Sequence, residues 1–174
     1  MSDNTETALL AGGCAWIMQQ LLRHPDGVIA TRVGWSGGPG DNPTEASPGG
    51  QAEAVEVVFD RKRISYRELL EYFFQVHRPD LGEDLVGPIY RSEIFYTSEE
   101  QRQVAEETIR DVDASGHWPG KTVTKISEAG HFWEDPTEHQ DYFMRYPDYP
   151  EGSKPPFPRV VAEAAIRENA AQLS

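Results

Sequence analysis

Apolar residues recur along this chain with two periods, which predict strands and helices in alternation. A short apolar run at Thr7–Ala11 indicates a buried strand, and Val28–Trp35 and Gln51–Phe59 indicate two more. Within the last of these, every second residue from 55 to 59 is apolar. Side chains alternate across a strand, so we expect this face to be buried.

The predicted helices have apolar residues three or four positions apart and begin at capping side chains. Ser65-Tyr66-Arg67-Glu68 is a capping box, in which the serine and glutamate side chains each bind the other residue's backbone N–H. The predicted helices are Ala15–His24, Ser65–His77, Thr97–Asp113, Pro136–Tyr146 and Val160–Leu173, and two further strands are predicted at Tyr90–Tyr96 and Val123–Ile126.

Stretches rich in glycine and proline connect these elements. Gly37–Gly50 is a long loop between two predicted strands, and loops of this kind are often functional or disordered. We favour a functional loop because of the segments that flank it, the predicted strands Val28–Trp35 and Gln51–Phe59. Pro79–Pro88 is predicted to be irregular, and Pro147–Pro158 is a proline-rich connector. A length of 174 residues without an internal repeat is typical of one domain.

Composition excludes several classes of function. The formal net charge of −13 argues against binding to nucleic acids or anionic membranes, because both need basic surfaces. No apolar run approaches the ~20 residues of a membrane span, and Met1–Asn4 lacks the basic and apolar regions of a signal peptide. The single cysteine excludes an internal disulfide and fits a reducing compartment, so we expect a cytoplasmic protein.

Metal and phosphate sites find little support. The five histidines are scattered, and no His/Cys pair has the spacing of metal ligands, so we expect no metal site. The glycines of Gly37–Gly40 are not followed by the Lys-Ser/Thr of a phosphate-binding loop.

Cys14 is the only cysteine, and it follows the pair Gly12-Gly13. Glycines allow a sharp turn between strand and helix, so Cys14 is expected at or just before a helix N-terminus. Unpaired N–H groups and the helix dipole stabilise a thiolate there, which predicts a lowered pKa and a nucleophile. A lone cysteine is also often a small buried hydrophobe, and that interpretation stays open at this point.

Glu53 is the second candidate. It lies on the apolar face of the predicted strand Gln51–Phe59, at the mouth of the buried region. A partly buried carboxyl has a raised pKa and can donate a proton near neutral pH. The alternative is a strand-end residue that points to water, which Glu56 on the opposite face fits better.

Gly13-Cys14-Ala15-Trp16 resembles the Gly-Cys-Phe-Trp-Gly signature of the peptide methionine sulfoxide reductase A family. The resemblance covers about Thr7–Tyr149. Its other blocks are Gly34-Trp35-Ser36-Gly37-Gly38, Asn42-Pro43-Thr44, Gln51-Ala52-Glu53-Ala54-Val55-Glu56-Val57, Ile64-Ser65-Tyr66, Tyr90-Arg91-Ser92, Ile94-Phe95-Tyr96, Phe132-Trp133-Glu134 and His139-Gln140-Asp141-Tyr142.

The resemblance implies a single mixed α/β domain over residues 1–174, with its core at about 7–149 and an extension at 150–174. A central, partly antiparallel sheet would carry helices, with an irregular C-terminal part around it. By resemblance, the Cys14 thiolate attacks the sulfur of a sulfoxide, Glu53 donates a proton to the sulfoxide oxygen, and Tyr90 hydrogen-bonds that oxygen. Cys14 ends as a sulfenic acid.

The same resemblance implies no bound cofactor and an external reductant. In many relatives further cysteines reduce the sulfenic acid, and this chain has none. An external thiol, such as thioredoxin, glutathione or a similar compound, would therefore attack Cys14 directly. The partner on the other side of the reaction is a small-molecule or peptidyl sulfoxide.

Departures from the family pattern gather at the predicted substrate pocket. The assigned substrate-binding residues are Ala15 for a family Phe, Trp16 as in the family, Trp35 for Tyr, Gln51 for His, Leu85 for Asp and Ile89 for Gln, and Ile17 replaces the Gly after the tryptophan. Each lost hydrogen-bonding partner can cost ~1–3 kcal/mol, so we expect a more apolar pocket and a sulfoxide bulkier and less polar than methionine sulfoxide. Two alternatives stay open: a relative repurposed for another small molecule in specialised metabolism, and a binding protein without catalysis.

Overall fold

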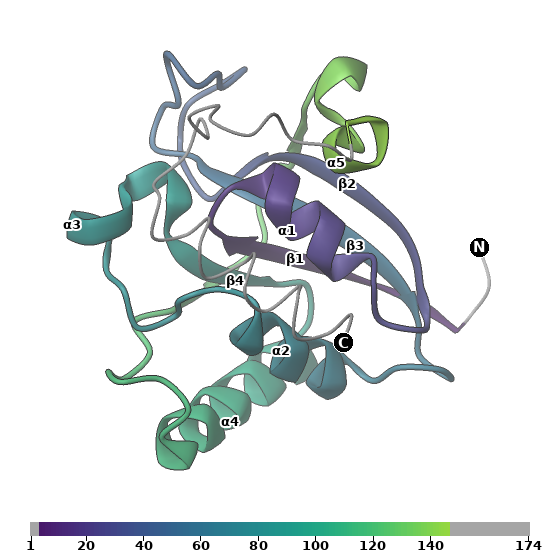
Figure 1. Ribbon diagram of the computed structural model, residues 1–174, viewed down its shortest axis with the longest axis vertical. Helices are drawn as coiled ribbons and strands as arrows, with labels where there is room; N and C mark the ends of the chain where they lie inside the picture. Colours follow the sequence, from purple (N-terminus) through teal and green to yellow (C-terminus); the bar gives the residue numbers. More distant parts are fainter. Residues whose placement is uncertain (1–3, 147–174) are drawn as a thin grey trace.

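The structure is a computed structural model that describes residues 4–146. Its centre is a six-stranded sheet with the strand order β5-β4-β1-β3-β2-β6 (Figure 1). The predicted connector Pro147–Pro158 and the helix Val160–Leu173 lie outside the described residues, so the domain limits of 1–174 stay a prediction. The strands are β1 (Thr5–Gly12), β2 (Val28–Ser36), β3 (Ala52–Asp60), β4 (Ser92–Tyr96), β5 (Lys125–Glu128) and β6 (Trp133–Glu134).

The sheet is mixed, as the sequence predicted. Strand β1 pairs in antiparallel with β3 and β4, and β2 pairs in antiparallel with β3 and β6, whereas β4 and β5 are parallel. The predicted strand Tyr90–Tyr96 is too long at its start, because Tyr90 ends the 3-10 helix η1 (Pro88–Tyr90) and β4 begins at Ser92. Strand β6 was not predicted.

The helices begin where capping side chains were predicted. Ser65 and Glu68 form the capping box, with Glu68 N–H donating to Ser65 Oγ at 3.0 Å and Ser65 N–H donating to Glu68 Oε1 at 3.2 Å. Ser98 accepts from the Gln101 N–H at 3.1 Å at the start of α4. The helices are α1 (Ala15–Leu22), α2 (Tyr66–Gln75), α3 (Glu83–Val86), α4 (Glu99–Ser115) and α5 (Tyr142–Arg145), with a second 3-10 helix, η2 (Thr137–His139).

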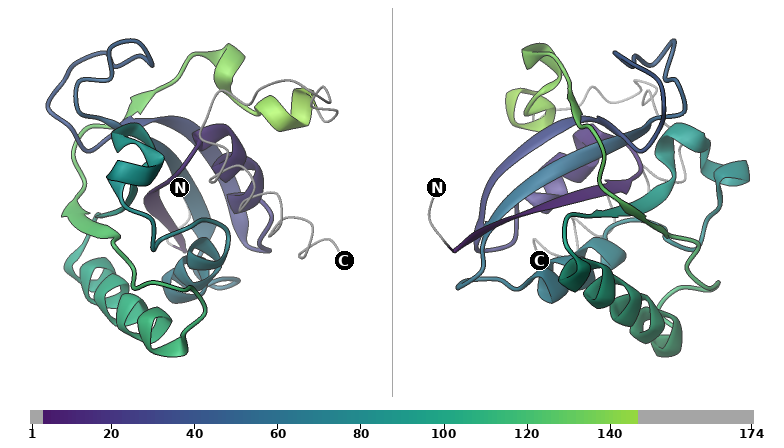
Figure 2. Two further views of the ribbon diagram at one scale, coloured as in Figure 1. Left: turned by 60° about the vertical axis from the view of Figure 1, so that its left-hand side comes forward. Right: turned by 180° about the vertical axis from the view of Figure 1, so that it is seen from behind.

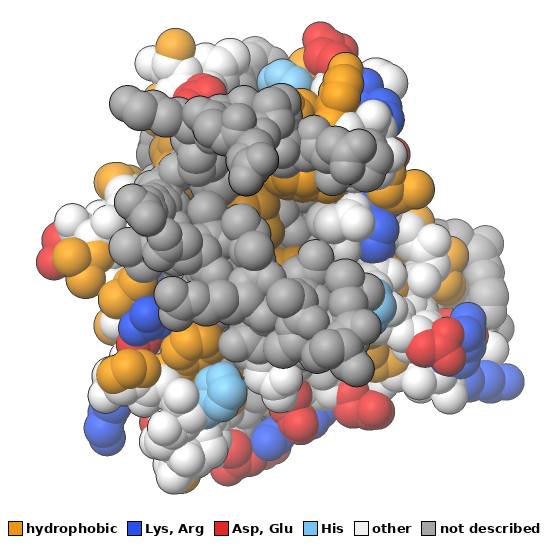
Figure 3. Space-filling model, viewed as in Figure 1, with side chains coloured by type: hydrophobic (Ala, Val, Ile, Leu, Met, Phe, Trp, Pro, Cys, Tyr) orange, Lys and Arg blue, Asp and Glu red, His pale blue; other side chains and the backbone are white. Residues whose placement is uncertain are grey.

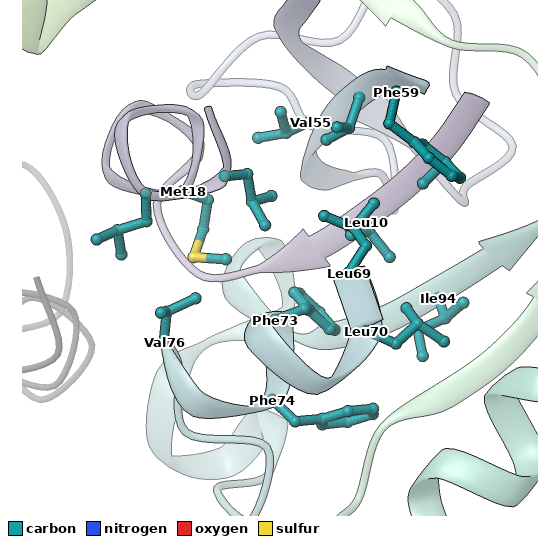
Figure 4. Close-up of a cluster of buried hydrophobic side chains, with 14 of the residues drawn as sticks. Leu10, Met18, Val55, Phe59, Leu69, Leu70, Phe73, Phe74, Val76 and Ile94 are labelled. Atoms are coloured by element: carbon teal, nitrogen blue, oxygen red, sulfur yellow. The ribbon is translucent and has the colours of Figure 1, made fainter. Parts of the chain in front are cut away.

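Apolar side chains pack on both faces of the central strands. Ala8 and Leu10 of β1 belong to the core cluster formed with α1 and α2, whereas Leu9 and Ala11 point to the other face and pack with Phe95. Figure 4 shows the larger cluster, with the aromatic and aliphatic side chains of α2 against β1, β3 and β4. Apolar burial of this kind stabilises the sheet and fixes its register.

The segment that leads to β6 crosses the face of the sheet opposite α1, as the view from behind in Figure 2 shows. Figure 3 shows acidic and basic side chains next to one another along the lower edge of the molecule, in the region of α4, where Arg102 forms ion pairs with Glu99 and Glu106. Within residues 4–146, no helix has the length and apolar character needed to cross a membrane.

The predicted helix Pro136–Tyr146 is interrupted. It consists of η2 and α5, separated at Gln140 and Asp141, where Asp141 has a φ of 54°. The Gln140 side chain explains the break, because its Oε1 accepts from the Val33 N–H at 2.9 Å and its Nε2 donates to the Val33 carbonyl at 2.9 Å. Gln140 thus satisfies the backbone of β2 beyond the end of the short strand β6.

Candidate active site

Cys14 lies between β1 and α1, at the N-cap of the helix, as the sequence predicted. Gly13 before it has a φ of 111°, a conformation that side-chain-bearing residues rarely adopt, and this allows the sharp turn. The Cys14 carbonyl accepts the Met18 N–H at 3.0 Å and so begins the helix. The thiol is therefore fixed by the junction of two regular elements.

The predicted thiolate with a lowered pKa is wrong for this resting structure. The Cys14 residue is only 3% exposed. Burial raises the pKa of its thiol far above the ordinary range, and the negative charge of Glu53 raises the pKa further. Hydrogen bonds from the backbone N–H groups of Ile17 and Trp16 act in the opposite direction but are outweighed. Desolvation therefore exceeds the effect of the helix N-terminus, and the resting thiol is neutral and shielded from solvent.

The pKa of the Glu53 carboxyl is raised, as the sequence predicted. Burial raises its pKa to about 8, and the negative charges of Asp135 and Glu45 contribute to this rise. Hydrogen bonds from the Ala15 backbone N–H and the Tyr90 phenol favour the ionised form and lower the pKa, but less strongly. At neutral pH the carboxyl is therefore largely protonated, as a general acid requires.

Tyr90 forms a hydrogen bond with Glu53. It is the last residue of η1, and its phenol donates to the Glu53 carboxyl. Burial, followed by the nearby charges of Glu53 and Cys14, raises the pKa of the phenol. Tyr90 therefore keeps its proton and acts as a hydrogen-bond donor. The structure brings together Cys14, Glu53 and Tyr90, the three residues that the sequence singled out for chemistry.

A cavity of about 350 Å³ is lined by Glu53, whereas Cys14 and Tyr90 are not part of its lining. The expected apolar pocket is only partly present, because the lining combines aromatic walls with several carboxyl groups. The lining consists of Trp16, Trp35 and Trp133, the carboxyl-bearing Glu45, Glu53, Glu134 and Asp135, the loop residues Asn42, Pro43 and Thr44, and Pro136 and His139.

Sheet register builds one wall of the cavity. Trp35 on β2 stands opposite Glu53 on β3 and opposite Trp133 on β6, so the three side chains form a row across neighbouring strands. The Trp35 indole N–H donates to Asp135 Oδ1 at 3.0 Å, and His139 Nδ1 lies 3.6 Å from Asp135 Oδ2. The one donor of Trp35 is thus occupied by Asp135.

The residues that follow Cys14 differ in exposure. Trp16 lines the cavity and stacks on Tyr142 with a centroid separation of 4.1 Å and an interplanar angle of 15°. Ala15 is 1% exposed and belongs to the hydrophobic core. The space expected at Ala15 for a larger substrate is therefore not open in this structure.

Besides Ala15, three more predicted substrate-binding residues do not line the cavity. Gln51 is 2% exposed, and its side chain accepts from the Gly38 N–H at 2.9 Å and donates to the carbonyls of Gly38 and Gly40 at 2.7 and 2.8 Å. Gln51 therefore anchors the long loop. Leu85 on α3 is 64% exposed, and Ile89 lies on η1.

Sequence reasoning missed Glu45, Asp135 and Trp133 as members of the site. Glu45 belongs to the loop that was predicted to be functional, but its residue type alone gave no signal. Asp135 and Trp133 come from the segment around the unpredicted strand β6. Trp133 belongs to the block Phe132-Trp133-Glu134, and Asp135 follows that block directly, so this block was the available clue. Within residues 4–146, no group of three or more His, Cys, Asp or Glu side chains is arranged to hold a metal ion.

Comparisons with known proteins agree with this geometry. Residues 6–165 match the family model described as peptide methionine sulfoxide reductase. The chain is 56% identical over 152 residues to the peptide methionine sulfoxide reductase MsrA of Nocardia farcinica, with 85% of this chain and 88% of that protein covered. It is 57% identical over 152 residues to MsrA 1 of Mesorhizobium japonicum, with the same shares covered.

Solved structures agree as well. Methionine sulfoxide reductase A of Corynebacterium diphtheriae has a TM-score of 0.77 and 26% identity, with 92% of this chain and 84% of that chain covered. Mxr1 from Saccharomyces cerevisiae, solved in complex with Trx2, has a TM-score of 0.60 and 24% identity, with 82% and 87% covered, and shows the fold alone. The family and the fold predicted from the sequence are confirmed, and the chain belongs to the peptide methionine sulfoxide reductase family of oxidoreductases.

Proposed function

We propose that this protein reduces methionine S-sulfoxide, free or in peptides, with Cys14 as the nucleophile. The observation that carries the proposal is the convergence of a thiol and a phenol on a protonated carboxyl that lines the cavity. Glu53 connects the three groups, because it accepts from Tyr90 and its charge acts on Cys14. Such an arrangement suits oxygen removal from a sulfoxide, which needs an attacking sulfur and a proton donor.

The first half-reaction moves two electrons from Cys14 to the substrate sulfur. Glu53 donates its proton to the sulfoxide oxygen, and Tyr90 hydrogen-bonds the same oxygen. The Cys14 sulfur attacks the substrate sulfur, a sulfur–sulfur bond forms, and the substrate oxygen leaves as water with the protons of Glu53 and the thiol. A water molecule then attacks the Cys14 sulfur, breaks the sulfur–sulfur bond, releases the thioether and returns a proton to Glu53. In the net step, thiol and sulfoxide become sulfenic acid and thioether.

The buried thiol fits this sequence of events. The charge of ionised Glu53 raises the pKa of Cys14, so protonation of Glu53 removes an obstacle to ionisation of the thiol. The protonated acid and the more acidic thiol therefore occur together. Shielding from water also protects the resting thiol from unspecific oxidation.

An external thiol completes the cycle. The chain has one cysteine, so reductant attacks the Cys14 sulfenic acid, releases water and forms a mixed disulfide, which a second thiol group resolves. The solved complex of Mxr1 with Trx2 supports a thioredoxin as the reductant. A dithiol protein would supply both thiol groups from one partner.

The cavity favours methionine sulfoxide over the bulkier sulfoxides suggested by the sequence. Ala15 opens no additional space, and Trp16, Trp35 and Trp133 wall a region suited to a thioether side chain. The curated relatives described above do not favour a repurposed activity or a binding protein without catalysis. We therefore assign N-acetylated or peptidyl methionine S-sulfoxide as the substrate to be tested first.

The test combines turnover with trapping of the intermediate. Purified protein, dithiothreitol and N-acetyl methionine S-sulfoxide should yield N-acetyl methionine, and without reductant dimedone should label Cys14 once per molecule of sulfoxide reduced. Cys14→Ser should lose both signals. Turnover that persists in Cys14→Ser would refute the proposed role of the thiol. A higher kcat/KM for aryl alkyl sulfoxides than for the methionine compound would overturn the substrate assignment.

The reductant needs a separate measurement. With substrate fixed, thioredoxin plus its reductase should support a higher turnover than glutathione at equal thiol concentration. Equal rates with both would contradict a protein reductant.

A further inference from the structure

Arg91 directly follows the proposed oxygen-binding residue Tyr90, but it is not part of the cavity lining. The residue is buried, and all three of its guanidinium nitrogens make hydrogen bonds. Nε donates to Glu93 Oε1 at 2.7 Å, Nη1 donates to the Pro88 carbonyl at 3.0 Å, and Nη2 donates to the Gly37 carbonyl at 3.1 Å. The guanidinium is therefore held in one orientation.

Arg91 and Glu93 form an ion pair, and Glu93 is itself held in place by a further hydrogen bond. Glu93 is buried on β4, and its second oxygen, Oε2, accepts from Ser127 Oγ on β5 at 2.7 Å. Glu93 thus fixes the Arg91 guanidinium to the sheet. The two Nη nitrogens of Arg91 donate to backbone carbonyls. A planar guanidinium can serve three acceptors in fixed directions, which the single ammonium of lysine cannot.

The two carbonyls that accept from Arg91 belong to two different segments near the site. Pro88 is the first residue of η1, the short helix that ends at Tyr90. Gly37 follows β2 directly and begins the loop whose residues Asn42 to Glu45 line the cavity. Space at this junction is tight, because a Cβ built on Gly37 would lie 3.0 Å from Arg91 Nη2. Arg91 therefore ties the helix that carries the phenol to the loop that forms the rim.

We propose that Arg91 is a positioning residue for the reductase reaction: it holds the Tyr90 phenol on the Glu53 carboxyl and the start of the Gly37–Gly50 loop beside the same cavity. This inference rests on the proposed function. Arg91 acts through Tyr90 and touches neither the substrate nor the reacting sulfur.

The pH profile distinguishes positioning from general structural support. The Tyr90 hydrogen bond lowers the pKa of Glu53 against the effect of burial. If the phenol moves away, the pKa of Glu53 rises, and the alkaline limb of the kcat/KM profile moves to higher pH. Tyr90→Phe provides the reference shift. Merely looser packing would lower activity without moving the limb.

The experiment compares five variants with the wild type. Arg91→Lys and Arg91→Met should shift the alkaline limb in the same direction as Tyr90→Phe, and kcat/KM at pH 7 should fall by about 10- to 100-fold, the range expected from a displaced reacting group. In the double variant Tyr90→Phe/Arg91→Met, the limb should move no further than in Tyr90→Phe alone. Ser127→Ala removes one hydrogen bond of Glu93 but leaves the Arg91–Glu93 ion pair and both carbonyl contacts, so its limb should move less than that of Arg91→Met.

One result would overturn the inference: a folded Arg91→Lys or Arg91→Met protein whose alkaline limb stays at the wild-type pH. If Arg91→Met fails to fold, Arg91→Lys decides, because lysine can keep the ion pair with Glu93. The carboxyl carbon resonance of Glu53, assigned with Glu53→Gln, gives the same pKa comparison in protein that turns over no sulfoxide. Failure of the proposed function is thereby separated from failure of this inference.

Discussion

Replacement of Glu53 by glutamine should make the protein more stable at alkaline pH while it removes the proposed proton donor. In the folded protein, burial raises the pKa of Glu53 from an ordinary value of 4.5 to about 8. In the unfolded chain the carboxyl returns to its ordinary pKa. Folding therefore takes up a proton at every pH between these two values.

The magnitude follows from proton linkage. A carboxyl whose pKa is raised by folding has no effect on stability below its unfolded pKa. As the pH rises from the unfolded pKa to the folded pKa, it lowers the free energy of unfolding progressively. In the middle of this range, one proton taken up on folding lowers the free energy of unfolding by about 1.4 kcal/mol per pH unit. Across the interval from 4.5 to about 8, this group removes up to about 5 kcal/mol from the stability of the wild-type protein. Glutamine is neutral in both states and carries no such dependence.

The assay is urea unfolding followed by tryptophan fluorescence at pH 5, 6, 7, 8 and 9. The stability of Glu53→Gln minus that of the wild type should increase steadily from pH 5 to pH 8 and level off above it. Asp41→Asn removes one acidic residue from the exposed part of the neighbouring loop and controls for net charge. Urea m-values should match between the proteins.

Parallel stability curves for the wild type and Glu53→Gln would refute this reasoning. They would mean that Glu53 ionises near its ordinary pKa in the folded protein. A general acid at neutral pH would then have to be sought elsewhere in the site.

Three further predictions concern the surroundings of the acid. Glu45→Gln removes a negative charge that raises the pKa of Glu53, so the alkaline limb of kcat/KM should move to lower pH, whereas Asp41→Asn, outside the cavity lining, should leave it in place. Gln51→Ala leaves the half-buried Gly38 N–H and the carbonyls of Gly38 and Gly40 without their Gln51 partner and should lower the free energy of unfolding in urea by ~1–3 kcal/mol. Gly34→Ala would place a Cβ 2.2 Å from a backbone oxygen of β6, so turnover should be lost while far-UV circular dichroism stays native.

Each of these predictions has its own contradicting result. Equal limb shifts in Glu45→Gln and Asp41→Asn would indicate a response to net charge and not to a charge at the cavity. An unchanged urea midpoint in Gln51→Ala would mean that water replaces the lost partners. Wild-type turnover in Gly34→Ala would mean that β6 can shift without harm to the site.

Local signals in the sequence predicted those parts of the fold that depend on local patterns. The alternation in β3 identified both its buried face and the partly buried Glu53. The capping box at Ser65 gave the start of α2, and the two glycines before Cys14 gave the turn into α1. Each of these features depends on residues that are close in sequence.

Features that depend on distant partners were beyond such reasoning. Strand β6 has two residues and exists because Trp133 and Glu134 meet β2, and the break before α5 exists because Gln140 reaches Val33. The pKa of Cys14 was predicted in the wrong direction, since the sequence shows the helix N-terminus but not the packing that removes water from the sulfur.

Strand β6 carries part of the cavity wall and is held to the sheet by few hydrogen bonds. Strand β6 forms its ladder with β2 at only two residue pairs, and the Gln140 side chain supplies the neighbouring hydrogen bonds. Local opening of this wall requires the loss of few bonds and no disruption of the main core. A fluctuation of this one edge would open the Trp133 side of the cavity to a larger molecule while the main core stays folded.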